Sequence, residues 1–250
     1  MGTWEFYAST LIPALNQGLW MSVLIIVPSA LLGIVIGMMA GAGRAAGPKW
    51  RKKVLGLYVS VFRGTPLVVQ LTMWYYGLPG VSRFLGSILG PLGWPPVSWK
   101  FLVFTPYVAS VVAFSLCSGA YQSEYIRGAI LSIRKGQFQA AKSLGFTKSQ
   151  TFWSITAPVA IRRALHGCGN EIIYLIKYSS LALIVTIQEL TGRSNALASF
   201  YFRPMECYLL TAMYYLALVT LASLLLHWLE KRLYVPGLGY SKEDKSPGVA

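Results

Sequence analysis

The chain has 250 residues, of which 55% are hydrophobic and only 12% are charged, and its formal net charge is +14. A soluble domain carries roughly 25% charged residues, so this composition excludes a water-soluble globular protein and indicates a helical integral membrane protein. The basic residues lie between long apolar stretches, which argues against a nucleic-acid-binding stripe. The three cysteines are scattered, so neither a disulfide framework nor a metal cluster is expected.

The first expected membrane span covers Gly18–Gly41. A spanning helix needs about 20 apolar residues, and this stretch is apolar almost throughout. Gly33, Gly37 and Gly41 recur at every fourth position, which places them on one face and predicts the close approach of another helix. Ordinary glycine content of a membrane helix is the alternative explanation.

The second expected span begins near Val54 and reaches Tyr76, and the stretch Arg63-Gly64-Thr65-Pro66 interrupts it. An arginine at mid-membrane costs roughly 2.5–3.5 kcal/mol. We therefore expect Val54–Phe62 to lie in the membrane interface, with Arg63 at headgroup depth. Pro66 would then begin the spanning helix, because the N–H that proline lacks has no partner at a helix N-terminus. Arg63, Gly64 and Pro66 are thus assigned a structural role.

Three further spans are expected, from Lys100 to about Tyr121, from Leu165 to Leu190 and from Cys207 to Leu229. The predicted fold is therefore an all-α integral membrane protein with five transmembrane helices. Basic residues gather in 44–53, in 123–163 and after Leu229, and few lie in the intervening loops. By the positive-inside rule, the N-terminus is outside and the C-terminus is cytoplasmic.

Residues 137–158 form a mildly polar loop between apolar segments. Residues 137–144 favour a helix, and Gly145 is a natural C-terminal stop. Thr147 and Gln150 have the spacing of a capping box, which predicts a second helix from Lys148, and Pro158 would end or redirect it. The loop is therefore expected to be two short helices at an angle.

Small side chains suit this loop to contact with another protein. Ala140 and Ala141 would let a partner approach the helix backbone, while Phe152, Trp153 and Ile155 would anchor the second helix to the membrane domain. A plain connecting loop is the alternative, since short structured loops are common.

The fourth span carries charges of both signs within an apolar run. Intramembrane charges usually face a bundle interior or a polar cavity. The residues that could line such a polar pathway, with charges of both signs, are Gln70, Asn170, Glu171, Tyr174, Lys177 and Tyr178. Glu171 and Lys177 are six residues apart and are not expected to pair with each other; contacts between helices are the alternative role for both. Glu124 is expected to pair with a nearby basic residue.

The loop also carries a recognisable pattern: Gln139-Ala140-Ala141, then Gly145, Ile155 and Pro158 at fixed intervals. This pattern resembles the EAA loop of ABC importer permeases, although the family usually has Glu at the position of Gln139. The resemblance to polar amino-acid permeases extends over roughly residues 16 to 235, through RGTPLVVQL (63–71), SEYIRGAILSI (123–133), NEIIYLIKYSSL (170–181) and LEKRL (229–233).

The resemblance implies a multi-pass permease subunit in the cell's inner (cytoplasmic) membrane that takes up a polar amino acid. One permease domain would fill residues 1–250, with a core at 16–235, the EAA loop at 136–158 and a flexible tail at 236–250. The implied partners are a second permease, identical or homologous, two cytoplasmic ATPases and an external solute-binding protein that docks on loops 78–99 and 191–206. The residues implied in coupling to the ATPase are Gln139, Ala140, Ala141, Leu144, Gly145, Phe146 and Pro158.

Catalytic, metal and cofactor sites are not expected in this chain. The stretch GAGRAAGPK (41–49) lacks the spacing of a phosphate-binding loop, so ATP would be bound by the partner ATPase. A small membrane enzyme and a passive channel remain as alternatives. The enzyme would need a cluster of carboxylates or histidines, whereas the eight acidic residues are dispersed. The amino acid carried, and the choice between homodimer and heterodimer, stay open.

Overall fold

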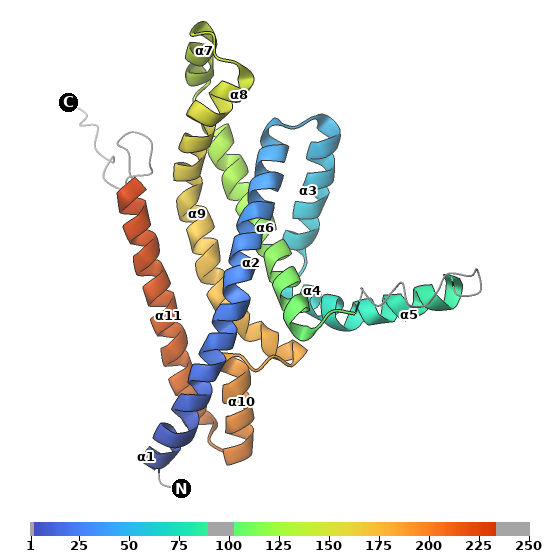
Figure 1. Cartoon of the computed structure of the whole chain (residues 1–250), viewed down its shortest axis with the longest axis vertical. Helices are drawn as coiled ribbons and strands as arrows, with labels where there is room; N and C mark the ends of the chain where they lie inside the picture. Colours follow the sequence, from blue (N-terminus) through green and yellow to red (C-terminus); the bar gives the residue numbers. More distant parts are fainter. Residues whose placement is uncertain (1–2, 90–102, 234–250) are drawn as a thin grey trace, which may run out of the picture.

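The computed structural model describes residues 3–89 and 103–233, and every regular element in these ranges is helical (Figure 1). This confirms the all-α prediction. The expected start of the third span at Lys100, part of loop 78–99 and the tail 236–250 lie outside the described residues. The α-helices are α1 (Thr3–Glu5), α2 (Ile12–Ala46), α3 (Lys49–Gly64), α4 (Leu67–Thr72), α5 (Leu78–Leu89), α6 (Pro106–Leu131), α7 (Lys135–Ser143), α8 (Lys148–Thr151), α9 (Ala157–Tyr178), α10 (Leu190–Tyr201) and α11 (Pro204–Leu233).

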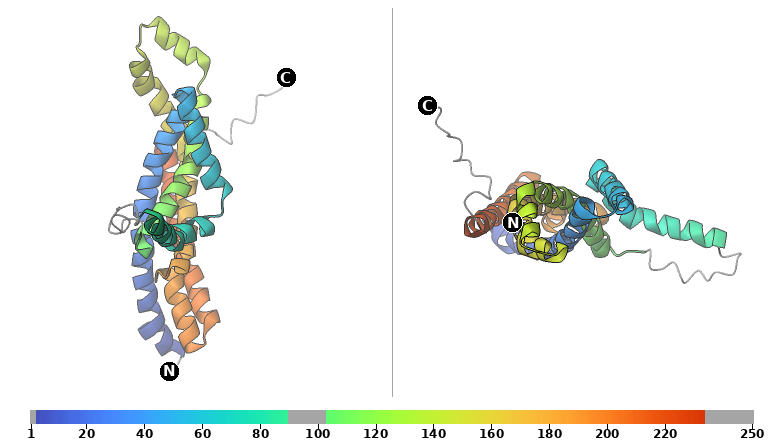
Figure 2. Two further views of the ribbon diagram at one scale, coloured as in Figure 1. Left: turned by 90° about the vertical axis from the view of Figure 1, so that its right-hand side faces the viewer. Right: turned by 90° about the horizontal axis from the view of Figure 1, so that it is seen from above.

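Four long helices, α2, α6, α9 and α11, run along the long axis of the molecule (Figures 1 and 2). Within the described residues, three stretches are long and apolar enough to cross a membrane: Phe6–Ala46, Lys148–Val185 and Pro204–Leu233. A fourth is the bent pair Lys49–Gly64 and Leu67–Ile88, if it counts as one span. The expected third span falls on α6, which packs against α2, α3 and α9 and buries several serines and Gln122 there.

Glycines bring α2 and α6 into close contact. A Cβ added to Gly37 would lie 2.7 Å from the Cβ of Gln122, and one added to Gly41 would lie 2.8 Å from the carbonyl oxygen of Ser123. Real Cβ atoms do not tolerate such distances, so this interface requires glycine. The predicted close approach along the Gly33–Gly37–Gly41 stripe is confirmed.

The expectation that Val54–Phe62 lies in the membrane interface is wrong. These residues belong to α3, which runs back alongside α2 and packs on α6 (Figure 1). Val59 is buried, and the Tyr58 hydroxyl donates to the carbonyl of Leu116 at 2.6 Å. The chain then bends by 103° at Thr65–Pro66. α4 and the π-helical Met73–Gly77 still pack on α6, with Leu71 fully buried, whereas α5 extends away from the bundle (Figure 1).

The fourth expected span, Leu165–Leu190, is not one straight helix. From α8, the chain continues through the π-helical Phe152–Thr156 into α9, where Pro158 sits in the first turn without ending the helix. After Tyr178 it tightens into a 3₁₀ segment, Ser179–Val185, which stops at Thr186 in a left-handed conformation (φ 69°). Four residues later α10 begins, and it folds back on α11 at the end of the molecule that carries the N-terminus (Figure 1).

Candidate functional site

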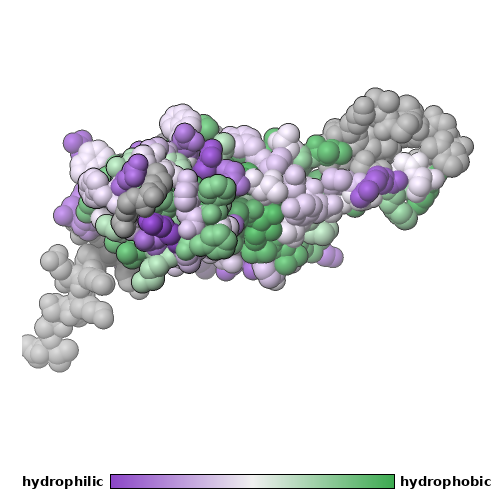
Figure 3. Space-filling view, turned by 90° about the horizontal axis from the view of Figure 1, so that it is seen from below, coloured by the Kyte–Doolittle hydropathy of each residue, from purple (hydrophilic) through white to green (hydrophobic). Residues whose placement is uncertain are grey.

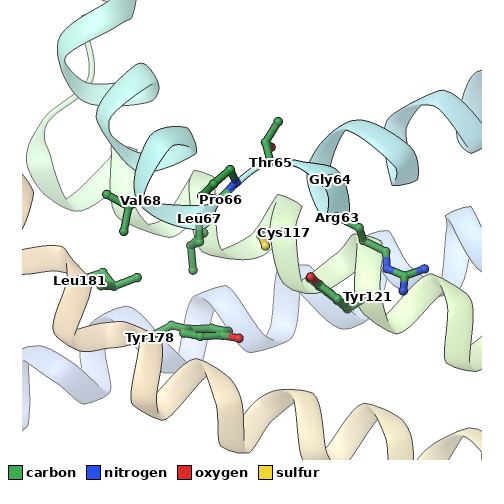
Figure 4. Close-up of a pocket in the computed structure, with 10 residues that line it drawn as sticks. All are labelled: Arg63, Gly64, Thr65, Pro66, Leu67, Val68, Cys117, Tyr121, Tyr178 and Leu181. Carbon is green, nitrogen blue, oxygen red and sulfur yellow. The ribbon is translucent and has the colours of Figure 1, made fainter.

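A cavity of about 440 Å³ lies at the break between α3 and α4 (Figure 4). The break forms one wall, α6 contributes Cys117 and Tyr121, and the end of α9 with the following 3₁₀ segment contributes Tyr178 and Leu181. The residues lining it are Arg63, Gly64, Thr65, Pro66, Leu67, Val68, Cys117, Tyr121, Tyr178 and Leu181. Three separate parts of the chain thus meet around one space that opens to the surface at the break, where Arg63, Thr65 and Pro66 are exposed.

Gln70 holds the break together. Its amide Nε2 donates to the carbonyl of Phe62 (2.8 Å), and to the carbonyl (3.0 Å) and hydroxyl (2.9 Å) of Thr65. Helix C-termini leave carbonyls without intrahelical partners, and here one side chain from the next helix serves them. Gln70 does not line the cavity, and its nitrogen is already engaged, so its position suits holding the backbone more than contacting a substrate.

Arg63 connects the cavity to a cluster of charges. Its guanidinium lies 3.5 Å from Glu124 and 5.0 Å from the centroid of the Tyr121 ring. Glu124 also pairs with Arg44 at 2.7 Å and Arg127 at 2.9 Å, which confirms the prediction that Glu124 has a basic partner. Three arginines around one carboxylate leave an excess of positive charge beside the cavity. The pairing also explains how Arg63 is accommodated within the bundle without a position at headgroup depth.

Glu171 is a buried residue close to the cavity that does not line it. It is only 4% exposed and lies within electrostatic range of Arg63, Cys117 and Tyr178, all of which line the cavity. The cavity therefore has a cation at its edge and a buried carboxyl group nearby.

The remaining residues of the predicted polar stripe lie elsewhere. Tyr174 and Lys177 are exposed, with the Lys177 Nζ 5.1 Å from the Tyr174 ring centroid. The Tyr174 ring stacks on Tyr178 at 6.0 Å, and Asn170 is half-buried. Among the described residues no ion pair joins Glu171 to Lys177, as their separation along the helix predicts.

Several cavity residues escaped the sequence analysis. Cys117 and Tyr121 lie one turn apart on α6, and only this i, i+4 spacing links them in the sequence. Leu67, Val68 and Leu181 are ordinary apolar residues, which mark no site without the fold.

A second feature is the hairpin of α7 and α8, which projects beyond the other helices at the end opposite the N-terminus (Figure 1). α7 ends in a Schellman motif, in which Phe146 N–H donates to the Ala141 carbonyl and Gly145 N–H to that of Lys142, both at 3.0 Å. Gly145 has φ +79°, which other residues adopt at a cost. Thr147 and Gln150 form the predicted capping box that starts α8.

The tip of the hairpin is exposed and partly apolar. Leu144 is 75% exposed, and Gln139, Ala140 and Phe146 are also accessible, whereas Ala141 is only 1% exposed. Adjacent residues on a helix point about 100° apart, so the structure leaves only the first alanine of the pair open to a partner.

The base of the hairpin is tied to the bundle, though not through all the expected anchors. Trp153 is 69% exposed and points away from the core, while Phe152 and Ile155 are half-buried. The Arg163 guanidinium donates to the carbonyl and hydroxyl of Ser132, both at 2.7 Å, and so joins the start of α9 to the end of α6. The described residues contain no group of three metal-ligating side chains.

Residues 33–235 match the family of binding-protein-dependent transport system inner membrane components. The glutamine transport system permease protein GlnP of Escherichia coli K12 is 34% identical over 224 residues, which cover 90% of this chain and 94% of that protein. The octopine transport system permease protein OccM of Rhizobium meliloti is 32% identical, covering 88% of this chain and 86% of that protein.

Solved structures agree with these relatives. A chain from an amino acid ABC transporter with histidines superposes with a TM-score of 0.76 and 28% identity, covering 93% of this chain and 100% of the other. A chain of the MetNI methionine ABC transporter, at 17% identity and a TM-score of 0.68, covers 91% of this chain and all of its own, and shares the fold. The chain is therefore a transport component and not an enzyme: it belongs to the binding-protein-dependent inner membrane components, the permease subunits of ABC importers.

Proposed function

We propose that this permease carries a polar amino acid into the cell past the cavity at the α3–α4 break. Relatives named for glutamine, octopine and cystine transport support an amino-acid substrate. Arg63 at the edge of the cavity would meet the carboxylate of a zwitterion, and the buried carboxyl group of Glu171 nearby would meet its ammonium group. Tyr121 and Tyr178 add aromatic surface on two sides (Figure 4).

The observation that carries the proposed mechanism is the exposed α7–α8 hairpin. Its backbone is satisfied by its own caps, so it keeps its shape without support from the bundle. The accessible apolar side chains of Leu144 and Phe146 at its tip suit a groove on another protein. We place this tip in the cytoplasm, against an ATPase whose closure moves the hairpin. Gln139 replaces the usual Glu there, so its contact would be a hydrogen bond and not a salt bridge.

The assembly follows from the same reasoning. Large apolar side chains cover the outward faces of α2 and α11, which suits lipid and a second permease subunit, identical or homologous. Two ATPases, and not this chain, would bind and hydrolyse the ATP that drives transport. An external solute-binding protein would deliver the amino acid at the end that carries α10, and the complex would lie in the cell's inner membrane.

The test is uptake by the reconstituted complex of permease, ATPase and binding protein in proteoliposomes. Deleting Gly145–Gln150 removes the turn and should abolish ATP-dependent uptake while the protein remains inserted. L144A should also reduce uptake. L221A is the matched control, because it truncates a leucine of similar exposure on α11, and it should retain uptake. A panel of labelled amino acids identifies the substrate.

Two results would refute this proposal. Uptake that persists after the deletion would show that the hairpin does not couple the ATPase to transport. Uptake at full rate without any ATPase would make the protein a passive channel.

A further inference from the structure

The part of the structure left unexplained by the cavity and the hairpin is a fully buried carboxylate, Glu189, just before α10. A carboxylate inside a membrane protein is costly and usually has a function. One oxygen accepts from the Gly192 backbone N–H at 2.8 Å and caps α10. A serine or asparagine would satisfy that role alone, so the cap does not explain the charge.

The second carboxylate oxygen joins α10 to two other helices. It accepts from the Tyr215 hydroxyl on α11 at 2.7 Å and faces the Ser22 hydroxyl on α2 at 3.5 Å. Ser22 in turn accepts from the Leu190 N–H at 3.3 Å, and Thr191 contacts the Tyr215 hydroxyl at 3.1 Å. Helices from the two ends of the sequence therefore meet at one carboxylate.

Backbone packing makes this junction rigid. A Cβ at Gly18 would come within 3.0 Å of the Glu189 carbonyl, and a Cβ at Gly192 within 2.4 Å of the Ile187 carbonyl oxygen. The turn is pressed against α2, with no room for the chain to shift by the width of a methyl group.

The junction lies between the cavity wall and the far end of the molecule. Eight residues before it, Leu181 lines the cavity. Beyond it, α10 leads to the end that carries the N-terminus, where Phe200 and Phe202 are exposed. Seen from that end, polar and apolar side chains share the surface, and α5 extends away from the bundle (Figure 3).

We infer that Glu189 is a positioning residue that joins α2, α10 and α11 into one rigid unit, so that a solute-binding protein docking at the α10 end displaces the wall of the cavity. This inference rests on the proposed function for the place of docking. It adds a specific residue that links the docking end to the transport pathway.

The experiment uses the full complex in proteoliposomes and measures ATPase activity without and with ligand-loaded binding protein. E189Q keeps the shape and the cap on Gly192, but its NH₂ group cannot accept from Tyr215 or Ser22. Y215F removes one donor to the carboxylate and leaves the ring. E230Q makes the same chemical change on α11 at a half-buried carboxylate whose partner is His166 and not the junction, and it is the matched control.

We expect E189Q and Y215F to leave the basal ATPase rate unchanged and to reduce stimulation by the binding protein about tenfold, within the usual range of coupling between sites. The double variant should be no worse than E189Q, since both act on one contact. E230Q should match the wild type.

Full stimulation of the E189Q ATPase activity by the binding protein would overturn the inference. A parallel loss of the basal and the stimulated ATPase rates would overturn it too, because it would mean that Glu189 only stabilises the fold. If the E189Q complex does not assemble, the basal and stimulated ATPase rates of Y215F test the inference in the same way. Failure of the proposed function is separate, because it would appear as a wild-type complex without ATP-driven uptake.

Discussion

Two breaks in the helices are held by opposite chemistry. At the α3–α4 break, the buried amide of Gln70 donates to carbonyls that the end of α3 leaves free. At the turn before α10, the buried carboxylate of Glu189 accepts from an N–H that the start of that helix leaves free. The end of a helix exposes acceptors and its start exposes donors, so each break selects the side chain that complements it.

The two breaks also differ in reach. The Gln70 amide nitrogen bonds to residues five and eight positions away, within its own break. Glu189 reaches residues 167 and 26 positions away, on α2 and α11. The first break is thus closed by bonds between neighbours in the sequence, whereas the second joins three helices. The second break, unlike the first, is therefore a brace between distant parts of the chain.

The largest effect is expected from E189L, which removes every bond of the carboxylate, leaves the Gly192 N–H without its partner and leaves the Tyr215 hydroxyl with Thr191 alone. Such losses cost about 3 kcal/mol in the free energy of unfolding. Denaturant titration of the purified protein in detergent measures it. Stability equal to that of the wild type would show that the second break is not a brace.

A smaller loss is expected from Q70E, because a carboxylate cannot donate and would face three oxygen acceptors. We expect about 2 kcal/mol in the same titration. Q70L is the matched control: it leaves the carbonyls unpaired without adding repulsion, so it should be the milder of the two. If Q70E were the milder, the amide would not be acting as a donor.

The α7–α8 hairpin also depends on caps at a helix end and a helix start, but it lies in solvent, so the loss of a cap should cost less stability there. G145A forces a side chain into a left-handed conformation and should cost about 1–2 kcal/mol in the opening free energy of residues 135–151. Hydrogen exchange of those amides measures it. G136A, where an added Cβ meets nothing within 4 Å, should leave protection intact; equal losses in both variants would contradict the role of φ at Gly145.

The smallest effect is expected at the start of α8. T147A removes the oxygen that accepts from Gln150 N–H and should cost about 1 kcal/mol locally. T147S keeps that oxygen and should protect the amides of 148–151 as the wild type does. The same exchange experiment separates them, and indistinguishable exchange in the two variants would argue against the capping box.

The sequence predicts some of these features and not others. The hairpin follows from Gly145, Thr147 and Gln150 because its caps join residues three to five positions apart. The Gly33–Gly37–Gly41 stripe of α2 can also be recognised in the sequence, but the sequence does not show that α6 is the helix that packs on it. The cavity depends on a bend at Thr65–Pro66 that swings the next helix through 103°, and residue order does not give that angle.

Long-range pairing explains the remaining gaps. The sequence analysis placed Arg63 at headgroup depth because an unpaired arginine is costly in the membrane. Its pairing with Glu124, 61 positions later, removes that cost. Glu189 passed unnoticed for the same reason, since Ser22 and Tyr215 are ordinary residues until the fold brings them to it.

The passage of the chain through Pro158 has a mechanical consequence. Because the π-helical turn carries α8 into α9 without a stop, residues 148–178 behave as one rod, about 45 Å long at 1.5 Å per residue. If the rod pivots near Tyr178, a tilt of about 5° swings its far end by about 4 Å, by the same length. In the proposed mechanism this rod would be a lever arm, in which a large displacement of the hairpin becomes a small displacement of the Tyr178 ring at the cavity.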